Sequence, residues 1–402
     1  MLRIPALRWS SLALFFRLLI ISLLLSTLST FGGAAPSAEL TEEQRALIFG
    51  KPGSVTVKKH VAKISLEGTD YRGFYKCTYM RAYINGKGPY TFLYDTGASF
   101  TAVSSKVIKA AHVQVTLDRG GYHDLLRIKK VNVGDVEIKD LFALRDDDFG
   151  VDGVFGFKTF GDMNVVFELQ KRQVLVSPDP VPLPGSFELP FEFVRNLPTI
   201  PVSVGTAQVA TLIDTGDDAY ALELRTEDLK GSTLVHKPSP ADSVLNGARS
   251  SPTYVSTLDS TVRLGPIAIE HAVVGINDAL PVPDFGVDFL KDFNIEFEPK
   301  RMLVRFQPLS ADSGTKIRGN LSPGFTLRFD DKGTVSNVVP GSAADQCGMR
   351  SGDRILSING LQIHTYTPRT WDEALSIGKS LAVQWQRGTK ERLDDFAVTE
   401  LR

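Results

Sequence analysis

The apolar residues of this chain fall in short runs separated by turn-forming residues, a pattern typical of β-structure. Examples are Tyr79–Ile84 followed by Asn85-Gly86, then Tyr90–Tyr94, and Val131–Val133 followed by a Gly-Asp turn. Helical windows are few, and the clearest is Ser104–Ala111, with Ser104 placed as an N-cap. The pattern therefore predicts a mostly β protein.

The first 38 residues do not follow this pattern of short apolar runs and turns. Arg3, Arg8 and Arg17 precede the apolar run Leu18–Leu25, and small residues follow at 32–35. A basic start, a short apolar core and small residues describe a secretory signal peptide, so we expect export to the periplasm or the medium. The alternative is an uncleaved signal that anchors the protein in a membrane.

Composition narrows the function classes. The chain has 402 residues, of which 43% are hydrophobic and 23% charged, with 45 basic against 46 acidic residues and a formal net charge of −1. Near-zero charge argues against nucleic acid as a partner. Two cysteines exclude a disulfide-dense scaffold, and the six histidines lack zinc-ligand spacing, so we expect no metal and no cofactor.

The β region contains an internal repeat. An apolar strand ends in Asp95-Thr96-Gly97, and a second ends in Asp214-Thr215-Gly216; downstream stand Val154-Phe155-Gly156 and Asp284-Phe285-Gly286. The same order at similar spacing predicts two related lobes. The expected domains are a signal (1–38), a polar N-terminal segment (39–54), lobe 1 (55–180), lobe 2 (181–308), a linker (309–319) and a C-terminal domain (320–402).

The paired Asp-Thr-Gly turns suggest a specific chemistry. Two carboxylates about 3 Å apart cannot both ionise, so they share one proton. One can then take a proton from water while the other donates to a carbonyl oxygen. Gly97 and Gly216 permit close backbone approach, and the hydroxyls of Thr96 and Thr215 are placed to tie one turn to the other.

Residues 55–307 resemble a bilobal aspartic protease, closer to a tandem of retropepsin-like lobes than to the longer pepsins. The resemblance implies a double β-barrel in which Asp95 and Asp214 are catalytic and Thr96, Gly97, Thr215 and Gly216 support them. It also implies a flap over the substrate, which we place at Gly120, Gly121 and Tyr122, and a second at the Asn246-Gly247 turn; ordinary surface hairpins are the alternative.

The second lobe departs from the family pattern. Asp217 and Asp218 follow its glycine, where small or hydroxyl residues are usual. Three outcomes are open: Asp217 faces solvent without consequence, it raises the proton affinity of the dyad, or the lobe is defective. In the last case the protein is a non-catalytic peptide-binding scaffold.

Residues 320–402 resemble a PDZ domain of the bacterial protease-associated type, on motifs such as Pro340-Gly341-Ser342-Ala343-Ala344 and Ile358-Asn359-Gly360. The resemblance implies a groove that binds an extended peptide by strand addition, with a carboxylate-binding loop at Pro323, Gly324, Phe325 and Thr326. The alternative is a domain that only docks on the lobes. The combined hypothesis is an exported aspartic endopeptidase with a polypeptide substrate and a PDZ peptide ligand.

Overall fold

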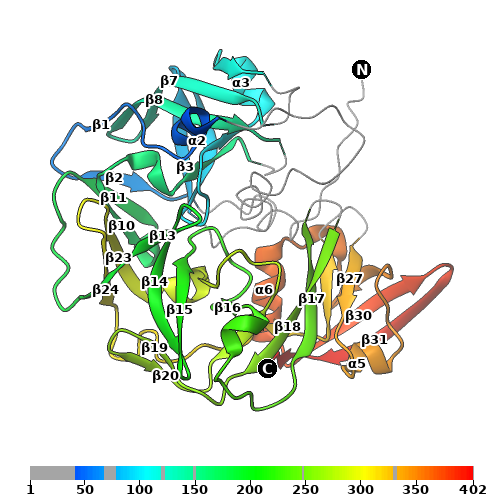
Figure 1. Cartoon of the computed structure of the whole chain (residues 1–402). Coiled ribbons are helices and arrows are strands. Elements are labelled where there is room, and N and C mark those ends of the chain that lie inside the picture. Colours follow the sequence, from blue (N-terminus) through cyan, green and yellow to red (C-terminus); the bar gives the residue numbers. More distant parts are fainter. Residues whose placement is uncertain are drawn as a thin grey trace, which may run out of the picture.

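The computed structural model describes residues 41–67, 78–118, 123–147, 151–246, 249–328 and 333–401. Figure 1 shows two β lobes, one above the other, with a third β unit beside the lower lobe. The mostly β architecture of a two-lobed protein followed by a PDZ-like unit is thereby confirmed.

Lobe 1 is built on an eight-stranded sheet in the order β1-β8-β5-β9-β4-β3-β7-β6, and an extra β7–β8 pairing closes it towards a barrel. The predicted helix is confirmed as α3, whose N-cap Ser104 accepts a hydrogen bond from the Val107 amide. The elements are β1 (Ser54–Val57), β3 (Tyr79–Ile84), β4 (Lys87–Asp95), β5 (Ala102–Val103), α3 (Ser105–Ala110), β6 (Gln114–Leu117), β7 (Leu125–Val133), β8 (Val136–Arg145) and β9 (Gly153–Gly156).

Lobe 2 repeats this plan in a ten-stranded sheet whose main path runs β17-β18-β21-β16-β22-β15-β14-β19-β20, with β13 beside β14. Its elements are β13 (Glu192–Val194), β14 (Leu197–Val204), β15 (Ala207–Ile213), β16 (Glu223–Leu224), β17 (Ser239–Asn246), β18 (Arg249–Thr257), β19 (Val262–Leu264), β20 (Ile267–Ile269), β21 (Val273–Ile276), β22 (Asp284–Phe285) and α4 (Val287–Leu290).

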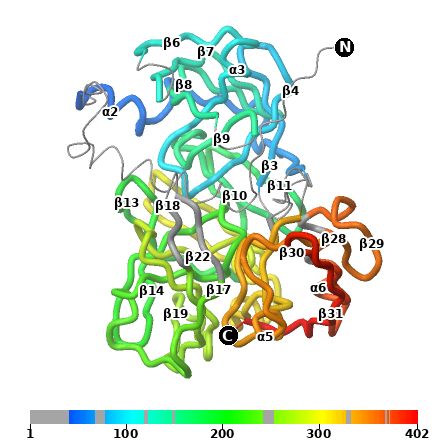
Figure 2. Tube along the Cα trace, turned by 90° about the vertical axis from the view of Figure 1, so that its right-hand side faces the viewer, coloured from blue at the N-terminus to red at the C-terminus, as the bar shows by residue number. Residues whose placement is uncertain are grey.

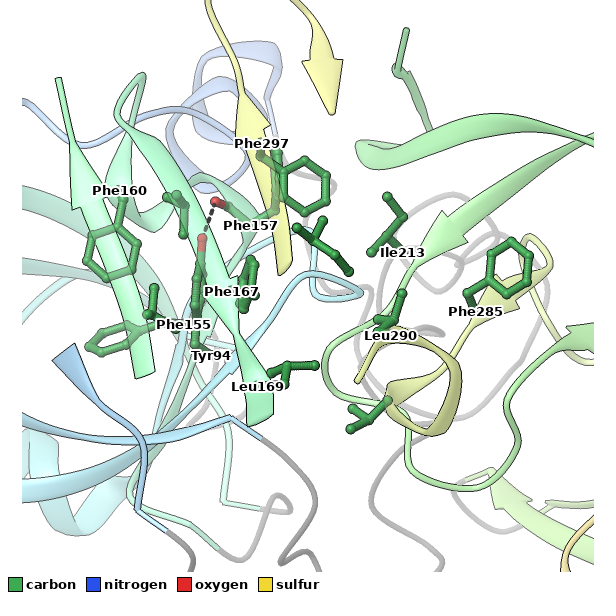
Figure 3. Packing of buried hydrophobic residues seen from close by; sticks show 14 of the residues in the cluster. Tyr94, Phe155, Phe157, Phe160, Phe167, Leu169, Ile213, Phe285, Leu290 and Phe297 are labelled. Carbon is green, nitrogen blue, oxygen red and sulfur yellow. Dashed lines mark hydrogen bonds between the residues drawn. The ribbon is translucent and has the colours of Figure 1, made fainter. Parts of the chain in front are cut away.

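A six-stranded sheet joins the lobes in the order β12-β24-β23-β10-β11-β2. Its centre is an antiparallel pair in which Phe167 of lobe 1 stands opposite Ile295 of lobe 2. Buried aromatic rings fill the junction, and Figure 3 shows Phe157, Phe167 and Phe297 meeting there. Its strands are β2 (Ala62–Ser65), β10 (Asn164–Glu168), β11 (Gln173–Ser177), β12 (Phe187–Pro190), β23 (Phe293–Glu298) and β24 (Leu303–Pro308).

The N-terminal segment contributes a short helix, α2 (Glu42–Ile48), that docks on lobe 1. Its N-cap Thr41 forms a capping box with Gln44. Ile48 is buried, and Phe49 packs edge-on against Phe100, five residues beyond Asp95. The segment predicted as polar therefore places an apolar end against the lobe.

The C-terminal unit contains a six-stranded sheet, β26-β27-β28-β30-β31 with β29 beside β28, and two helices. Ser342, in the Pro340–Ala344 motif, is the N-cap of α5, where its side chain accepts a hydrogen bond from the Asp345 amide. The elements are β25 (Leu321–Ser322), β26 (Phe325–Arg328), β27 (Thr334–Val338), α5 (Ala343–Gln346), β28 (Arg354–Ile358), β29 (Leu361–Gln362), α6 (Pro368–Ile377), β30 (Ser380–Arg387), β31 (Lys390–Ala397) and β32 (Thr399–Glu400).

This C-terminal unit lies against lobe 2 rather than lobe 1 (Figure 2). Strand β27 is in contact with β17, and the Asn337 side-chain amide donates to the Ala241 carbonyl at 3.0 Å. The first residue of the unit also touches lobe 2, since the Asn320 side-chain amide donates to the Ala219 carbonyl at 2.6 Å.

The predicted signal peptide lies outside the described residues. Among the residues that are described, no helix has the length and apolar character needed to cross a membrane.

Candidate active site

The structure brings the two predicted aspartates together at the junction of the lobes. Asp95 is the last residue of β4, and Asp214 directly follows Ile213 at the end of β15. Both side chains are buried, with 3% of Asp95 and 7% of Asp214 exposed. The two carboxyl groups share a side-chain hydrogen bond. Two positions far apart in sequence thus form one carboxyl pair.

The glycines of the two turns hold this pair in place. The Gly97 amide donates to Asp95 Oδ1 and the Gly216 amide donates to Asp214 Oδ1, both at 2.7 Å. Each glycine also faces the opposite aspartate: a Cβ on Gly97 would lie 2.0 Å from Asp214 Oδ2, and one on Gly216 would lie 2.4 Å from Asp95 Cγ. Only glycine allows this close approach.

The threonines interlock the two turns symmetrically. Thr96 Oγ1 donates to the Ile213 carbonyl at 2.5 Å and accepts from the Thr215 amide at 3.0 Å. Thr215 Oγ1 donates to the Tyr94 carbonyl at 3.0 Å and accepts from the Thr96 amide at 3.1 Å. Both threonines are fully buried, so these bonds fix one lobe's turn on the other without water.

The environment favours a proton on the pair. Burial raises the pKa of Asp95 well above its ordinary value, and the charge and hydrogen bond of Asp214 raise it further. Burial also raises the pKa of Asp214. Because the groups interact directly, they titrate as a unit that retains one proton over a wide pH range.

Asp217 does not face solvent, which removes the first of its three expected outcomes. It is 4% exposed, and its Oδ1 accepts a hydrogen bond from the Ala219 amide at 2.8 Å. Burial and the neighbouring charge of Asp214 raise its pKa well above the ordinary value. Asp217 therefore adds a buried acidic group next to Asp214.

Two further acids that the sequence analysis missed join Asp217. Asp284 and Glu223 are buried, and oxygen atoms of the three carboxylates lie within 4.8 Å of one another. Carboxylate oxygens are ligands that hard cations accept, so this acidic trio is the arrangement nearest to a metal site in the described chain. Comparing Asp284-Phe285-Gly286 with Val154-Phe155-Gly156 could have revealed Asp284 as an acid in an apolar position.

The predicted first flap, Gly120, Gly121 and Tyr122, lies outside the described residues. The strands that flank it, β6 and β7, are paired as an antiparallel hairpin. The second hairpin, β17–β18, is paired up to Asn246 and Arg249, on either side of the predicted turn. The flap role stays a prediction for both.

The predicted PDZ loop begins the edge strand of its sheet. Gly324 has a φ of +91°, its amide donates to Ser322 Oγ, and its carbonyl accepts from the Val339 amide and Ser342 Oγ. Pro323 is buried beside it. Among described strands β26 pairs with β27 alone, so its other edge can accept a peptide strand.

The side chains of the other two predicted PDZ residues, Phe325 and Thr326, contact their own domain. The Phe325 side chain is 1% exposed and packs on Trp371 and Phe396, so only its backbone is available to a ligand. Thr326 Oγ1 lies 2.7 Å from Ser336 Oγ of the neighbouring strand β27.

Two known protein families match separate parts of the chain. The model of a family described as aspartyl protease matches residues 80–159, which include the Asp95 turn, and the model of the PDZ domain matches residues 334–387. The chain combines a protease-like domain with a PDZ domain.

Curated relatives share shorter regions. The periplasmic pH-dependent serine endoprotease DegQ of Escherichia coli is 28% identical over 101 residues, covering 23% of this chain and 22% of DegQ. The periplasmic serine endoprotease DegP of the same species is 24% identical over 133 residues, covering 31% and 28%. Mouse rhophilin-1 is 37% identical over 71 residues, covering 18% and 10%. The chain thus spans less than a third of each of these relatives.

Proposed function

We propose that this protein is an aspartic endopeptidase that hydrolyses peptide bonds through Asp95 and Asp214. The observation that carries the proposal is the hydrogen-bonded carboxyl pair, buried between two interlocked Asp-Thr-Gly turns. The aspartyl protease family model on residues 80–159 supports it. Two relatives are named as serine endoproteases, so a serine-type mechanism is the competing possibility that cleavage in the presence of class-specific inhibitors distinguishes.

The mechanism follows from one proton on two carboxyl groups. The ionised carboxylate accepts a proton from a water molecule as its oxygen attacks the peptide carbonyl carbon. The protonated carboxyl donates to the carbonyl oxygen, giving a neutral tetrahedral diol. Transfer of a proton to the amide nitrogen then releases the amine and the carboxylic acid. Thr96, Gly97, Thr215 and Gly216 fix the two carboxyl groups so that no reorganisation is needed.

We further propose that the protein is exported and that its PDZ domain binds a polypeptide end along β26. Export rests on the signal-like sequence of residues 1–38 and agrees with the periplasmic relatives. The free edge of β26 and the Gly324 turn suit strand addition.

The test is cleavage of an unfolded protein by the purified chain across acid to neutral pH. We expect cleavage that a statine-type transition-state mimic blocks and that a serine-directed sulfonyl fluoride leaves unchanged. Asp95→Asn and Asp214→Asn should each abolish it, whereas the exposed Asp312→Asn should not. Equal cleavage by Asp95→Asn and the parent would refute the proposal, and peptide binding without turnover would favour the non-catalytic scaffold.

A further inference from the structure

The registers of the two sheets show which residues of the lobes are equivalent. In lobe 1, Ala102 of β5 stands opposite Val154 of β9. In lobe 2, Glu223 of β16 stands opposite Asp284 of β22. Strands β9 and β22 each run parallel to the strand that leads to an aspartate. Glu223 and Asp284 therefore occupy the positions of Ala102 and Val154.

The third acid has an apolar counterpart too. Ala98 and Asp217 each follow the aspartate of their lobe by three positions. Their carbonyls do the same work: Ala98 accepts from the Phe157 amide at 3.0 Å and Asp217 from the Val287 amide at 2.7 Å. The acidic trio of lobe 2 thus replaces three apolar residues of lobe 1 on an equivalent backbone.

These positions lie on the sheet face that carries the aspartates. Side chains alternate along a strand, so Leu93 shares a face with Asp95, while Phe92 and Tyr94 point into the main core. Leu93, Ala98, Ala102 and Val154 belong to one apolar cluster on the Asp95 face. By the equivalence above, the acidic trio lies on the Asp214 face.

Lobe 2 has a smaller residue beside Glu223 than lobe 1 has at the equivalent position. In the parallel neighbour strands, Ala102 stands opposite Leu144 in lobe 1, and Glu223 stands opposite Gly275 in lobe 2. A Cβ on Gly275 would lie 2.9 Å from Tyr220 Cγ and 3.1 Å from Glu223 Cγ. The missing side chain at Gly275 leaves space that the Tyr220 ring and the Glu223 stem share.

Two carboxyl groups of the trio, those of Asp217 and Asp284, share a side-chain hydrogen bond with each other. Asp217 Oδ2 and Asp284 Oδ1 are buried and receive no hydrogen bond from a backbone amide or a basic side chain of the described residues. Buried polar atoms are nearly always paired, and an unpaired one costs about 1–3 kcal/mol. Oxygens held in this way beside a catalytic face are suited to a ligand that brings both donors and positive charge.

We propose that Asp217, Glu223 and Asp284 form a subsite that binds a lysine or arginine side chain of the polypeptide substrate. This inference rests on the proposed function and places the subsite close to the scissile bond, on the lobe 2 side. The equivalent face of lobe 1 takes an apolar side chain. A guanidinium offers several N–H donors in a fixed fork, and a long stem lets its charge reach buried oxygens. The trio lies on the sheet face that carries Asp214, so a peptide that reaches the dyad along this face also meets the trio.

The experiment maps cleavage sites in digests of unfolded proteins by mass spectrometry and compares matched peptides that carry arginine or uncharged citrulline. The parent should enrich basic residues within three positions on one side of the cut and apolar residues on the other. Replacing arginine by citrulline should lower kcat/KM about tenfold or more. Asp284→Val, which installs the lobe 1 residue, should remove the basic preference.

Asp284→Asn keeps the shape without the charge and gives a second readout should the valine variant fold poorly; Asp312→Asn is the control. No basic enrichment in the parent, or enrichment unchanged in both Asp284 variants, would overturn the inference. So would a trio that instead binds Ca²⁺ or Mn²⁺, seen as metal-dependent thermal stability that the Asp284 variants abolish.

These outcomes are separable from those for the proposed function. Cleavage that requires Asp95 but ignores substrate charge refutes only the subsite. If the parent shows no turnover, the arginine and citrulline peptides are compared by binding, and equal affinities would then refute the subsite.

Discussion

Replacing Thr96 by valine tests the interlock that builds the site. Valine keeps the shape of threonine but loses the hydroxyl, leaving the Thr215 amide and the Ile213 carbonyl buried without their partners. Each such group costs about 1–3 kcal/mol, so the variant should lose about 2–6 kcal/mol of unfolding free energy. For lobes of this size that corresponds to a fall in Tm of roughly 5–20 °C.

Differential scanning calorimetry provides the assay, and Thr96→Ser is the control because it retains the hydroxyl. The serine variant should lose about 1 kcal/mol, from one buried methyl group. The PDZ transition should not move in either variant. A Thr96→Val protein whose lobes melt within a degree of the Thr96→Ser protein would refute the reasoning. The Thr96→Val/Thr215→Val double variant should be non-additive, because both hydroxyls act on the same pair of turns.

Two further predictions concern the faces of the lobes. Burial raises the pKa of Asp217 and Asp284, so the folded protein holds these protons more tightly than the unfolded chain. The unfolding free energy should therefore fall as the pH rises from about 4 through the raised pKa values. The expected loss is about 1.4 kcal/mol for each unit by which a pKa is raised. Denaturant titrations at several pH values should show a flatter profile for Asp217→Ala/Asp284→Val, and an equal slope would contradict this. Ile48→Ala should weaken the docking of α2 by about 2–5 kcal/mol, seen as faster hydrogen exchange at residues 42–49, while the exposed Glu43→Ala should leave exchange unchanged.

Local features of the fold were predictable from sequence because they depend on neighbouring residues. The Asp-Thr-Gly turns end apolar strands, and their repeated order pairs Asp95 with Asp214, which the structure brings together. Ser104 caps the helix expected of it. In each case a short stretch of chain contains both the signal and the structure that it specifies.

The remaining features depend on pairings between distant segments. Glu223 carries no local signal, and its place in the trio follows from the pairing of β16 with β21 and β22. The antiparallel pairing of β10 with β23 and the docking of α2 likewise join segments that sequence alone does not align. Asp217 was singled out, but its burial follows from the packing of its loop against Gly286.

The duplicated backbone explains how one site can have two chemically different sides. Both lobes must supply an aspartate, a threonine and a glycine, because each turn is completed by the other. Residues behind the turns meet no such requirement, and there lobe 2 has Asp284 where lobe 1 has Val154. Since the same register holds valine in one lobe and aspartate in the other, the backbone tolerates either residue. The backbone of the dyad turns therefore does not depend on the residue at this position, and Asp284→Val changes the charge next to Asp214 while keeping a residue that the equivalent lobe 1 register already holds.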